Sequence, residues 1–103
     1  MRIKTMLNRE LLDKPCIIDF YTDWCQPCKM LAPILDDLSK EYDGKVDISQ
    51  VDTEAEQELS GAFGIRSIPS ILFVPMNEKL QMSAGLLDKK ALGNVIHDAL
   101  KVS

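Results

Sequence analysis

Cys25 and Cys28 are the residues whose type and spacing could do chemistry. Gln26 and Pro27 separate them, and Trp24 precedes them. Two thiols at this spacing can close and reopen a small disulfide when both lie on the first turn of a helix. The unpaired backbone N–H groups and the dipole at a helix start favour a thiolate over a thiol. The pair therefore predicts a dithiol/disulfide redox centre.

Zinc binding is the alternative for this spacing. A tetrahedral zinc site needs about four Cys, His or carboxylate ligands, which a second paired motif usually supplies. The other candidates, Cys16 and His97, lie far from the pair in sequence and in unrelated predicted elements. We therefore expect no metal and no organic cofactor.

Length and charge limit the other functions. A chain of 103 residues, 46% of them hydrophobic, has room for one domain, which we expect to span residues 1–103. The formal net charge of −4 argues against nucleic acid or an anionic membrane as a partner. No segment approaches the ~20 apolar residues of a membrane span. The N-terminus shows no signal-peptide pattern, so we expect a cytoplasmic location.

The elements that must position the two thiols follow from hydrophobic periodicity. Residues 16–21 are apolar apart from one aspartate, which is typical of a strand buried on both faces. A helical pattern then extends from Cys25 to about residue 42. The other predicted helices are short ones at 6–13 and 54–63 and a last one at 88–101 with Asp88 as its N-cap. The other predicted strands are one at 45–51 and an antiparallel hairpin of a fully apolar strand at 71–74 and a half-buried strand at 79–84.

This order of elements predicts the fold class. A helix between two strands implies that they are parallel, and a short turn implies that they are antiparallel. We therefore expect an α/β fold with a central mixed β-sheet flanked by helices.

Asp19 is the one charged residue inside the apolar run at 16–21. Burial is costly for a carboxyl group and raises its pKa toward neutrality, where it can transfer protons. The alternative is that the strand turns Asp19 to solvent at a sheet edge. We favour the buried position, from which Asp19 would take the proton of Cys28. Cys25, expected to be the more exposed thiol, would attack a substrate disulfide, and the more buried Cys28 would resolve the mixed disulfide.

These residues resemble the thioredoxin family over nearly the whole chain. The motifs, in the order and at the spacings of that family, are Ile18-Asp19-Phe20, Trp24-Cys25-Gln26-Pro27-Cys28-Lys29, Ala32-Pro33, Val51-Asp52, Gly64-Ile65-Arg66-Ser67-Ile68-Pro69 and Gly85. The resemblance implies the thioredoxin fold and a reductase of protein disulfides. It also implies a thioredoxin reductase as the partner that supplies electrons.

The resemblance further implies a substrate-binding groove. Its lining residues would be Trp24, Pro27, Ile68, Pro69 and Gly85. Pro69 would follow a cis peptide bond, whereas the residues alone would suggest an ordinary trans proline at the start of a strand.

The sequence departs from the family at several places. Gln26 stands where the commonest motif has glycine, which affects the reduction potential and the shape of the groove. Gln50 stands where some members place a lysine near the buried acid, so proton transfer should depend on Asp19 and water. Few residues precede the first predicted helix, so the first strand is expected to be short or missing, leaving a sheet edge that could allow dimerisation. We expect a monomer.

Two other functions remain open from the sequence. One is a disulfide oxidase or isomerase of the same fold, and the other is a redox-inactive module that binds peptides or proteins. The intact pair Cys25 and Cys28, with Asp19 and Pro69, argues against a module of the second kind.

Overall fold

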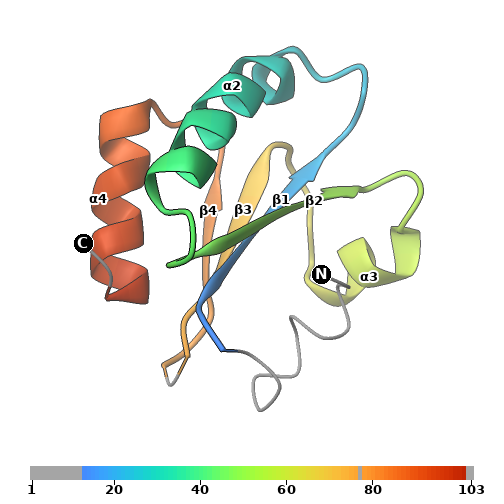
Figure 1. Cartoon of the computed structure of the whole chain (residues 1–103). Coiled ribbons are helices and arrows are strands. Elements are labelled where there is room, and N and C mark those ends of the chain that lie inside the picture. The colour runs from blue at the N-terminus through green and yellow to red at the C-terminus, as the bar shows by residue number, and fades with distance from the viewer. Residues whose placement is uncertain (1–12, 77, 102–103) are drawn as a thin grey trace.

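Strands and helices are arranged around β1 (Cys16–Tyr21), the apolar run that the sequence predicts as a central strand (Figure 1). The structure is a computed structural model that describes residues 13–76 and 78–101. Its elements are β1 (Cys16–Tyr21), α2 (Gln26–Glu41), β2 (Asp47–Asp52), α3 (Gln57–Ala62), β3 (Ser70–Val74), β4 (Gln81–Ala84) and α4 (Lys89–Leu100). The helix predicted at 6–13 and the predicted short or missing first strand lie outside the described residues.

The four strands form one mixed sheet in the order β2-β1-β3-β4. β1 is parallel to β2 and antiparallel to β3, and β3 is antiparallel to β4. β1 is therefore an inner strand, and helices on both faces of the sheet explain why its sequence is apolar on both faces. The predicted mixed sheet flanked by helices is confirmed.

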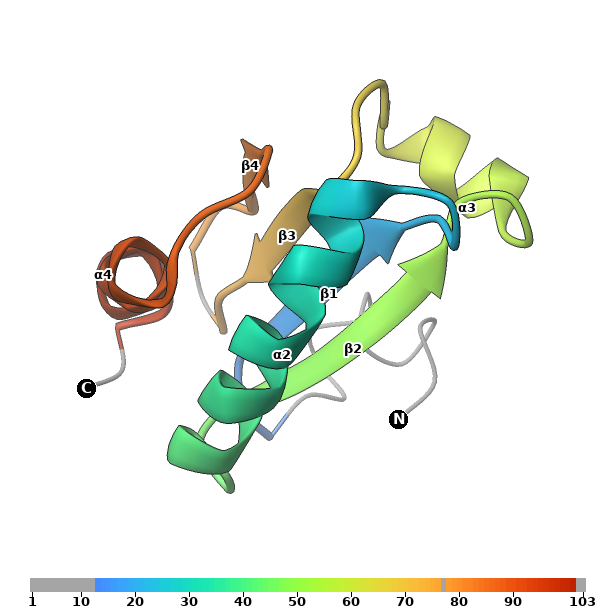
Figure 2. The same cartoon turned by 90° about the horizontal axis from the view of Figure 1, so that it is seen from above.

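The helices cover the two faces of the sheet unequally (Figure 2). α2 and α4 pack on the face to which Ile17 points, and α3 packs on the face to which Ile18 points. The buried residues of the first face are Ile17, Leu31, Leu35, Leu38, Val46, Ile71, Phe73, Leu92, Ile96, Ala99 and Leu100. Those of the second are Cys16, Ile18, Phe20, Val51, Leu72 and Val74, with Leu59 and Phe63 packed against them.

β4 differs from the half-buried strand that its sequence predicts. It begins at Gln81 rather than at residue 79, and three of its four residues are exposed. Met82 retains 42% of its accessible surface. The reason is position in the sheet: within the described residues β4 pairs only with β3 and so forms an edge of the sheet.

The segment predicted as a helix from residue 54 is also different. α3 begins only at Gln57, and the residues before it form a turn around the side chain of Asp52. The Oδ1 atom of Asp52 accepts hydrogen bonds from the backbone N–H groups of Glu54 at 2.9 Å and Ala55 at 3.4 Å. An aspartate that satisfies these donors favours a turn over a helix at this point.

Asp88 offers a direct test of how α4 begins. Its Oδ1 atom accepts a hydrogen bond from the backbone N–H of Ala91 at 2.7 Å, as the sequence predicts for an N-cap. Asp88→Ala should lower the free energy of unfolding by about 1 kcal/mol, measured by urea denaturation, because this donor loses its partner. Asp98→Ala is the control, since it removes a carboxylate from the opposite end of the same helix and should not destabilise the protein. Equal losses in the two variants would contradict the capping role.

Candidate functional site

Cys25 and Cys28 lie where β1 gives way to α2, as the sequence predicts. Cys25 is the N-cap residue of α2, and its Cα atom is 5.2 Å from that of Cys28. The two residues are joined by a disulfide. The Sγ atom of Cys25 also accepts a hydrogen bond from the backbone N–H of Cys28 at 3.2 Å. The first of the two sulfurs thus occupies the position where a helix start stabilises negative charge.

The exposure of the two sulfur-bearing residues differs from the prediction. Cys25 is 4% exposed and Cys28 is 5% exposed, so the expectation that Cys25 is the more exposed residue is wrong for the disulfide form. Cys25 is buried because its side chain lies against the first turn of α2 rather than projecting away from it. The distinction between the thiols therefore comes from their places on the helix.

Asp19 is fully buried on the face of the sheet that α2 covers. The prediction of a buried carboxyl group is confirmed, and the alternative of a solvent-facing side chain is wrong. The Nε2 atom of Gln50, the residue opposite Asp19 in the parallel pairing of β1 and β2, donates to Oδ2 at 3.4 Å. The Oδ1 atom has no hydrogen-bond partner among the described residues.

The surroundings of Asp19 shift its pKa in two directions. Burial raises the pKa, and the hydrogen bond from Gln50 lowers it by a smaller amount. The net result is a pKa of about 6. Burial wins because an ionised carboxylate loses more hydration than one weak neutral donor replaces. Asp19 can therefore take up and release a proton near neutral pH.

A solvent-accessible hollow lies between Gln50 and Cys28. Its volume is about 240 Å³, which is enough for several water molecules. Its lining residues are Tyr21, Thr22, Asp23, Cys28, Lys29, Ala32 and Gln50. The buried hydroxyl of Thr22 has no hydrogen-bond partner among the described residues and is suited to contact such water. Gln50 thus links the Asp19 carboxyl to a space that also reaches the second cysteine.

The residues predicted to line a groove are placed individually. The peptide bond between Ile68 and Pro69 is cis, as the resemblance implies. The backbone N–H of Gly85 donates to the carbonyl oxygen of Pro69 at 2.8 Å, so these two positions lie side by side. Gly85 has φ +93°, a conformation that glycine adopts without strain. Ile68 is half-buried, and Pro27 is exposed.

Trp24 has a contact that the sequence does not reveal. Its side chain is 68% exposed, and its Nε1 atom donates to the Oε1 atom of Glu54 at 3.1 Å. Nothing in the spacing of two residues 30 positions apart indicates this pairing. By contrast, the contact of Gln50 with Asp19 could have been found by aligning the predicted parallel strands.

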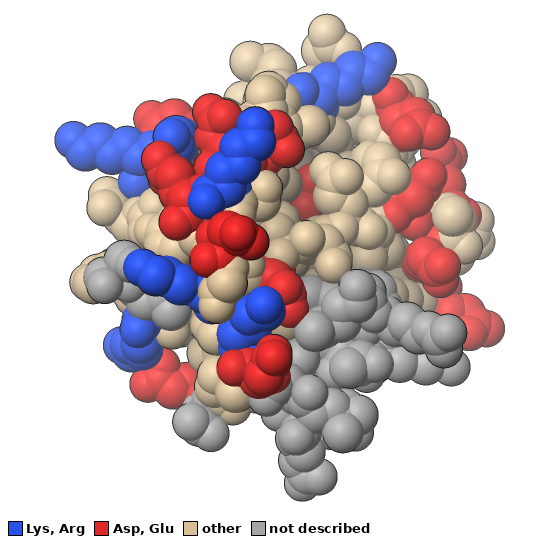
Figure 3. All heavy atoms as spheres, in the orientation of Figure 1, with Lys and Arg blue, Asp and Glu red and all other residues tan. Residues whose placement is uncertain are grey.

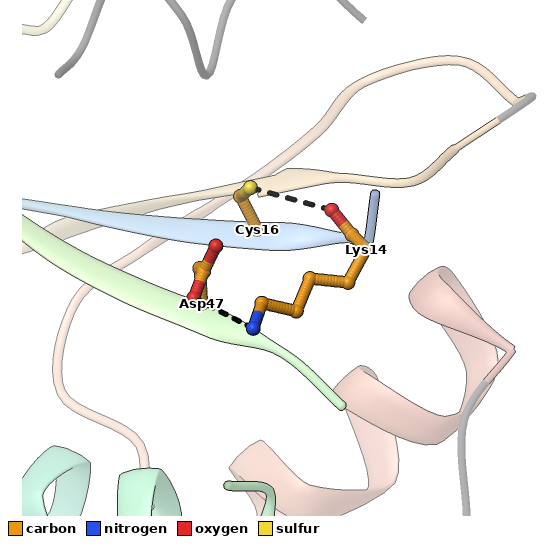
Figure 4. A network of polar contacts seen from close by, with 3 residues as sticks. All are labelled: Lys14, Cys16 and Asp47. Carbon is orange, nitrogen blue, oxygen red and sulfur yellow. Dashed lines mark hydrogen bonds and ion pairs between the residues drawn. The ribbon is translucent and has the colours of Figure 1, made fainter. Parts of the chain in front are cut away.

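Cys16 is outside this site. It is fully buried, and its Sγ atom donates to the carbonyl oxygen of Lys14 at 3.6 Å (Figure 4). Asp47, which forms an ion pair with Lys14 at 3.5 Å, lies nearby. Burial, followed by the Asp47 charge, raises the pKa of the Cys16 thiol to about 11, so it is a poor nucleophile. Its predicted role in packing agrees with this environment.

The described part of the chain shows neither a metal-binding cluster nor a membrane-spanning helix. It contains no cluster of three or more His, Cys, Asp or Glu residues able to hold a metal ion. None of its helices is both long enough and apolar enough to cross a membrane.

Comparisons with known proteins agree on one family. The family model described as Thioredoxin matches residues 3–98. The thioredoxin of Borreliella burgdorferi is 50% identical over 86 residues, covering 84% of this chain and 74% of that protein. The thioredoxin of Haemophilus influenzae is 40% identical over 85 residues, covering 82% and 79%.

Solved structures give the same result for the fold. Chloroplastic thioredoxin z matches with a TM-score of 0.79 and 27% identity, over 84% of this chain and 78% of that one. The germline-specific thioredoxin Deadhead of Drosophila melanogaster matches with a TM-score of 0.77 and 31% identity, over 85% and 83%.

The burial of Asp19 predicts a pH-dependent stability. Well below pH 3.8, the ordinary pKa of the group, the carboxyl is protonated in the folded and the unfolded chain alike. As pH rises, the unfolded chain ionises first, so the wild type loses stability until the pH passes the folded pKa of about 6. The rise of the pKa from 3.8 to about 6 corresponds to about 3 kcal/mol.

Asp19→Asn should be free of this loss. Urea denaturation at several pH values should show the stability of the variant relative to the wild type rising between about pH 4 and 7, and then remaining level. A difference that does not change with pH would show that Asp19 ionises as easily in the folded state as in the unfolded chain.

Gln50→Leu should raise the pKa of Asp19 above about 6, because the hydrogen bond that lowers it is lost. The measurement is an NMR titration of the Asp19 carboxyl carbon. Ser39→Ala is the control, since Ser39 lines a neighbouring hollow with Gln50 but donates its own hydrogen bond to the Asp36 carbonyl oxygen. An unchanged pKa in Gln50→Leu, or an equal shift in Ser39→Ala, would contradict the role of this amide.

Proposed function

The chain belongs to the thioredoxin family and is a thiol–disulfide oxidoreductase, and we propose that Cys25 and Cys28 are its catalytic thiols and thioredoxin reductase its electron donor. The observation that carries the proposal is the disulfide at the start of α2, where Cys25 is the N-cap and receives the N–H of Cys28. The direction of electron flow is from the reduced pair to disulfides of other proteins.

The first step is attack by Cys25. In the dithiol form its thiolate attacks one sulfur of a substrate disulfide, so that a mixed disulfide forms and one substrate thiolate leaves. The helix dipole and the N–H of Cys28 stabilise the attacking thiolate. Only a pair at a helix start gives the first cysteine this advantage over the second.

The second step is resolution by Cys28. Its thiolate attacks the sulfur of Cys25, which closes the Cys25–Cys28 disulfide and releases the second substrate thiolate. The substrate has then gained the two electrons that the dithiol has lost. Thioredoxin reductase restores the dithiol by returning two electrons to the pair.

Asp19 is the proposed acceptor of the Cys28 proton. Its pKa of about 6 lets it hold this proton near neutral pH, and its free Oδ1 atom gives the proton a place to bind. The hollow lined by Cys28 and Gln50 would hold the water that carries the proton between them. Tyr21, Asp23 and Lys29 are the other ionisable groups that line it.

Substrate chains would bind across the residues around the disulfide, of which Trp24 and Pro27 are exposed. The proposed groove consists of Trp24, Pro27, Ile68, Pro69 and Gly85. The family resemblance supports this assignment, in which the backbone of Ile68 would pair with an extended substrate segment. The proposed partners are proteins that carry disulfides. The proposed location is the cytoplasm, where the environment is reducing.

Reduction of insulin, coupled to thioredoxin reductase and NADPH, tests the proposal. The wild type should turn over, and Cys25→Ser should abolish turnover because the nucleophile is lost. Cys28→Ser should accumulate a mixed disulfide with the substrate, visible on a non-reducing gel, because no thiol remains to resolve it. Cys16→Ala is the matched control and should retain activity, since Cys16 is buried away from the pair.

Two outcomes would contradict the proposal. No turnover by the wild type, with the insulin still bound, would indicate a redox-inactive binding module. Poor coupling to the reductase together with rapid oxidation of a dithiol peptide by the disulfide form would indicate an oxidase or isomerase.

A further inference from the structure

Thr22 carries a buried hydroxyl whose presence the fold does not explain. The residue follows β1 directly and is 3% exposed, and its Oγ1 atom has no hydrogen-bond partner among the described residues. Burying a hydroxyl without a partner costs free energy. An apolar side chain of similar size would avoid that cost. The hydroxyl therefore points to a role other than stability.

Thr22 lies at the hollow that Cys28 also reaches. Both residues line it, and so does Gln50, whose amide donates to the Asp19 carboxyl at 3.4 Å. With a volume of about 240 Å³, the hollow has room for several water molecules. A hydroxyl can donate one hydrogen bond and accept others, so Thr22 can hold a water molecule in a defined orientation. The second cysteine, a hydroxyl and the amide that contacts Asp19 thus meet at one space.

We propose that Thr22 is a positioning residue for the resolving step, because its hydroxyl binds the water through which the Cys28 thiol passes its proton to Asp19. This inference rests on the proposed function. In the mixed disulfide, the water accepts the proton of Cys28 and gives one of its own protons to the Asp19 carboxylate. The Cys28 thiolate then attacks the sulfur of Cys25, so that the Cys25–Cys28 disulfide forms and the substrate thiolate leaves. Thr22 itself neither gains nor loses a proton.

Charge is the competing influence on proton transfer and must be separated from the hydroxyl. Acidic side chains gather on the side of the molecule where α3 lies (Figure 3). Three ionisable groups also line the hollow: Tyr21 at the end of β1, Asp23 in the following loop and Lys29 in α2. Valine has nearly the shape of threonine, and Thr22→Val leaves all of these charges in place. An effect of this substitution therefore belongs to the hydroxyl.

Three further variants complete the comparison. Thr22→Ser keeps the hydroxyl and removes only the methyl group. Thr53→Val is the matched control, because the hydroxyl that it removes donates to the carbonyl oxygen of Tyr21 at 3.2 Å and does not line the hollow. Asp19→Asn removes the proposed proton acceptor, and it is combined with Thr22→Val to test whether the two residues act in one path.

Stopped-flow absorbance with 5,5′-dithiobis(2-nitrobenzoate) separates the two chemical steps of the dithiol protein. Attack by Cys25 releases the first aromatic thiolate at a rate that rises with reagent concentration, and closure of the disulfide by Cys28 releases the second at a rate that does not. Thr22→Val should slow the second phase about three- to tenfold near pH 7, the factor for the loss of one neutral hydrogen bond, and leave the first phase unchanged. Thr22→Ser should restore most of the second-phase rate, and Thr53→Val should match the wild type in both phases.

The pH profile of the second phase shows whether the hydroxyl acts through Asp19. In the wild type this phase should accelerate as the pH passes about 6, the pKa of the buried Asp19 carboxyl, because only the ionised carboxyl accepts a proton. Thr22→Val should lose most of this rise and approach the wild-type rate above about pH 8.5, where an ordinary thiol ionises without a base. In the Asp19→Asn background, Thr22→Val should slow the second phase little further, since the water no longer has an acceptor.

Three kinetic results would overturn the proposal. They are an unchanged second phase in Thr22→Val, an equal slowing in Thr22→Ser, and a full additional slowing when Thr22→Val is combined with Asp19→Asn. A wild type that shows no second phase is a different result, because it would overturn the proposed role of Cys28 as the resolving thiol and with it the role of Thr22.

Urea denaturation separates this role from a structural one. Thr22→Val should unfold no more easily than the wild type, because the hydroxyl that it removes has no partner among the described residues. A clear loss of stability in Thr22→Val, restored in Thr22→Ser, would show that the hydroxyl serves the fold and would overturn the proposal.

Discussion

The site depends on β1 being buried between two other strands. Because β2 and β3 pair with its two edges and helices cover both faces, Asp19 is enclosed in surroundings that disfavour its charge. The same strand ends at Tyr21, from which the chain passes directly to Cys25 at the start of α2. One buried strand thus provides both an acid with a raised pKa and the position of the thiol pair. A β1 at the edge of the sheet would leave the acid hydrated and unable to serve as a base near neutral pH.

Stability and function make opposite demands on Asp19. A buried carboxyl group destabilises the folded state above its pKa, and a strong cationic partner would remove that penalty by holding it ionised. Gln50 is a compromise between the two, since a neutral amide donates one long hydrogen bond at 3.4 Å without supplying a charge. The carboxyl therefore keeps an affinity for protons near neutral pH. Under the proposed mechanism, proton transfer would be controlled by the Gln50 amide dipole and by water in the adjoining hollow rather than by an ion pair.

The sequence predicted those features that depend on local pattern. β1 and the buried position of Asp19 follow from a short apolar run, and the place of Cys25 follows from the helical pattern after it. The exposure of individual residues was harder to predict. For β4 it depends on which strand lies outermost, and for Cys25 it depends on how the side chain lies against the helix start, so both differ from the prediction. The cis bond before Pro69 required the family resemblance, since the residues alone favour trans. The contact between Trp24 and Glu54 arises only when distant loops meet, and no local pattern encodes it.

The parallel pairing of β1 and β2 explains why these distant loops meet. Parallel strands end at the same edge of a sheet, so the loop after β1 and the turn after β2 emerge together. Inside that edge the pairing places Gln50 against Asp19, and beyond it the pairing brings Glu54 to Trp24. One register therefore sets two contacts, one at the buried Asp19 carboxyl and one at the exposed Trp24 indole. Because the two contacts share no side chain, substitutions in one need not disturb the other, and the two can vary independently on the same pair of strands.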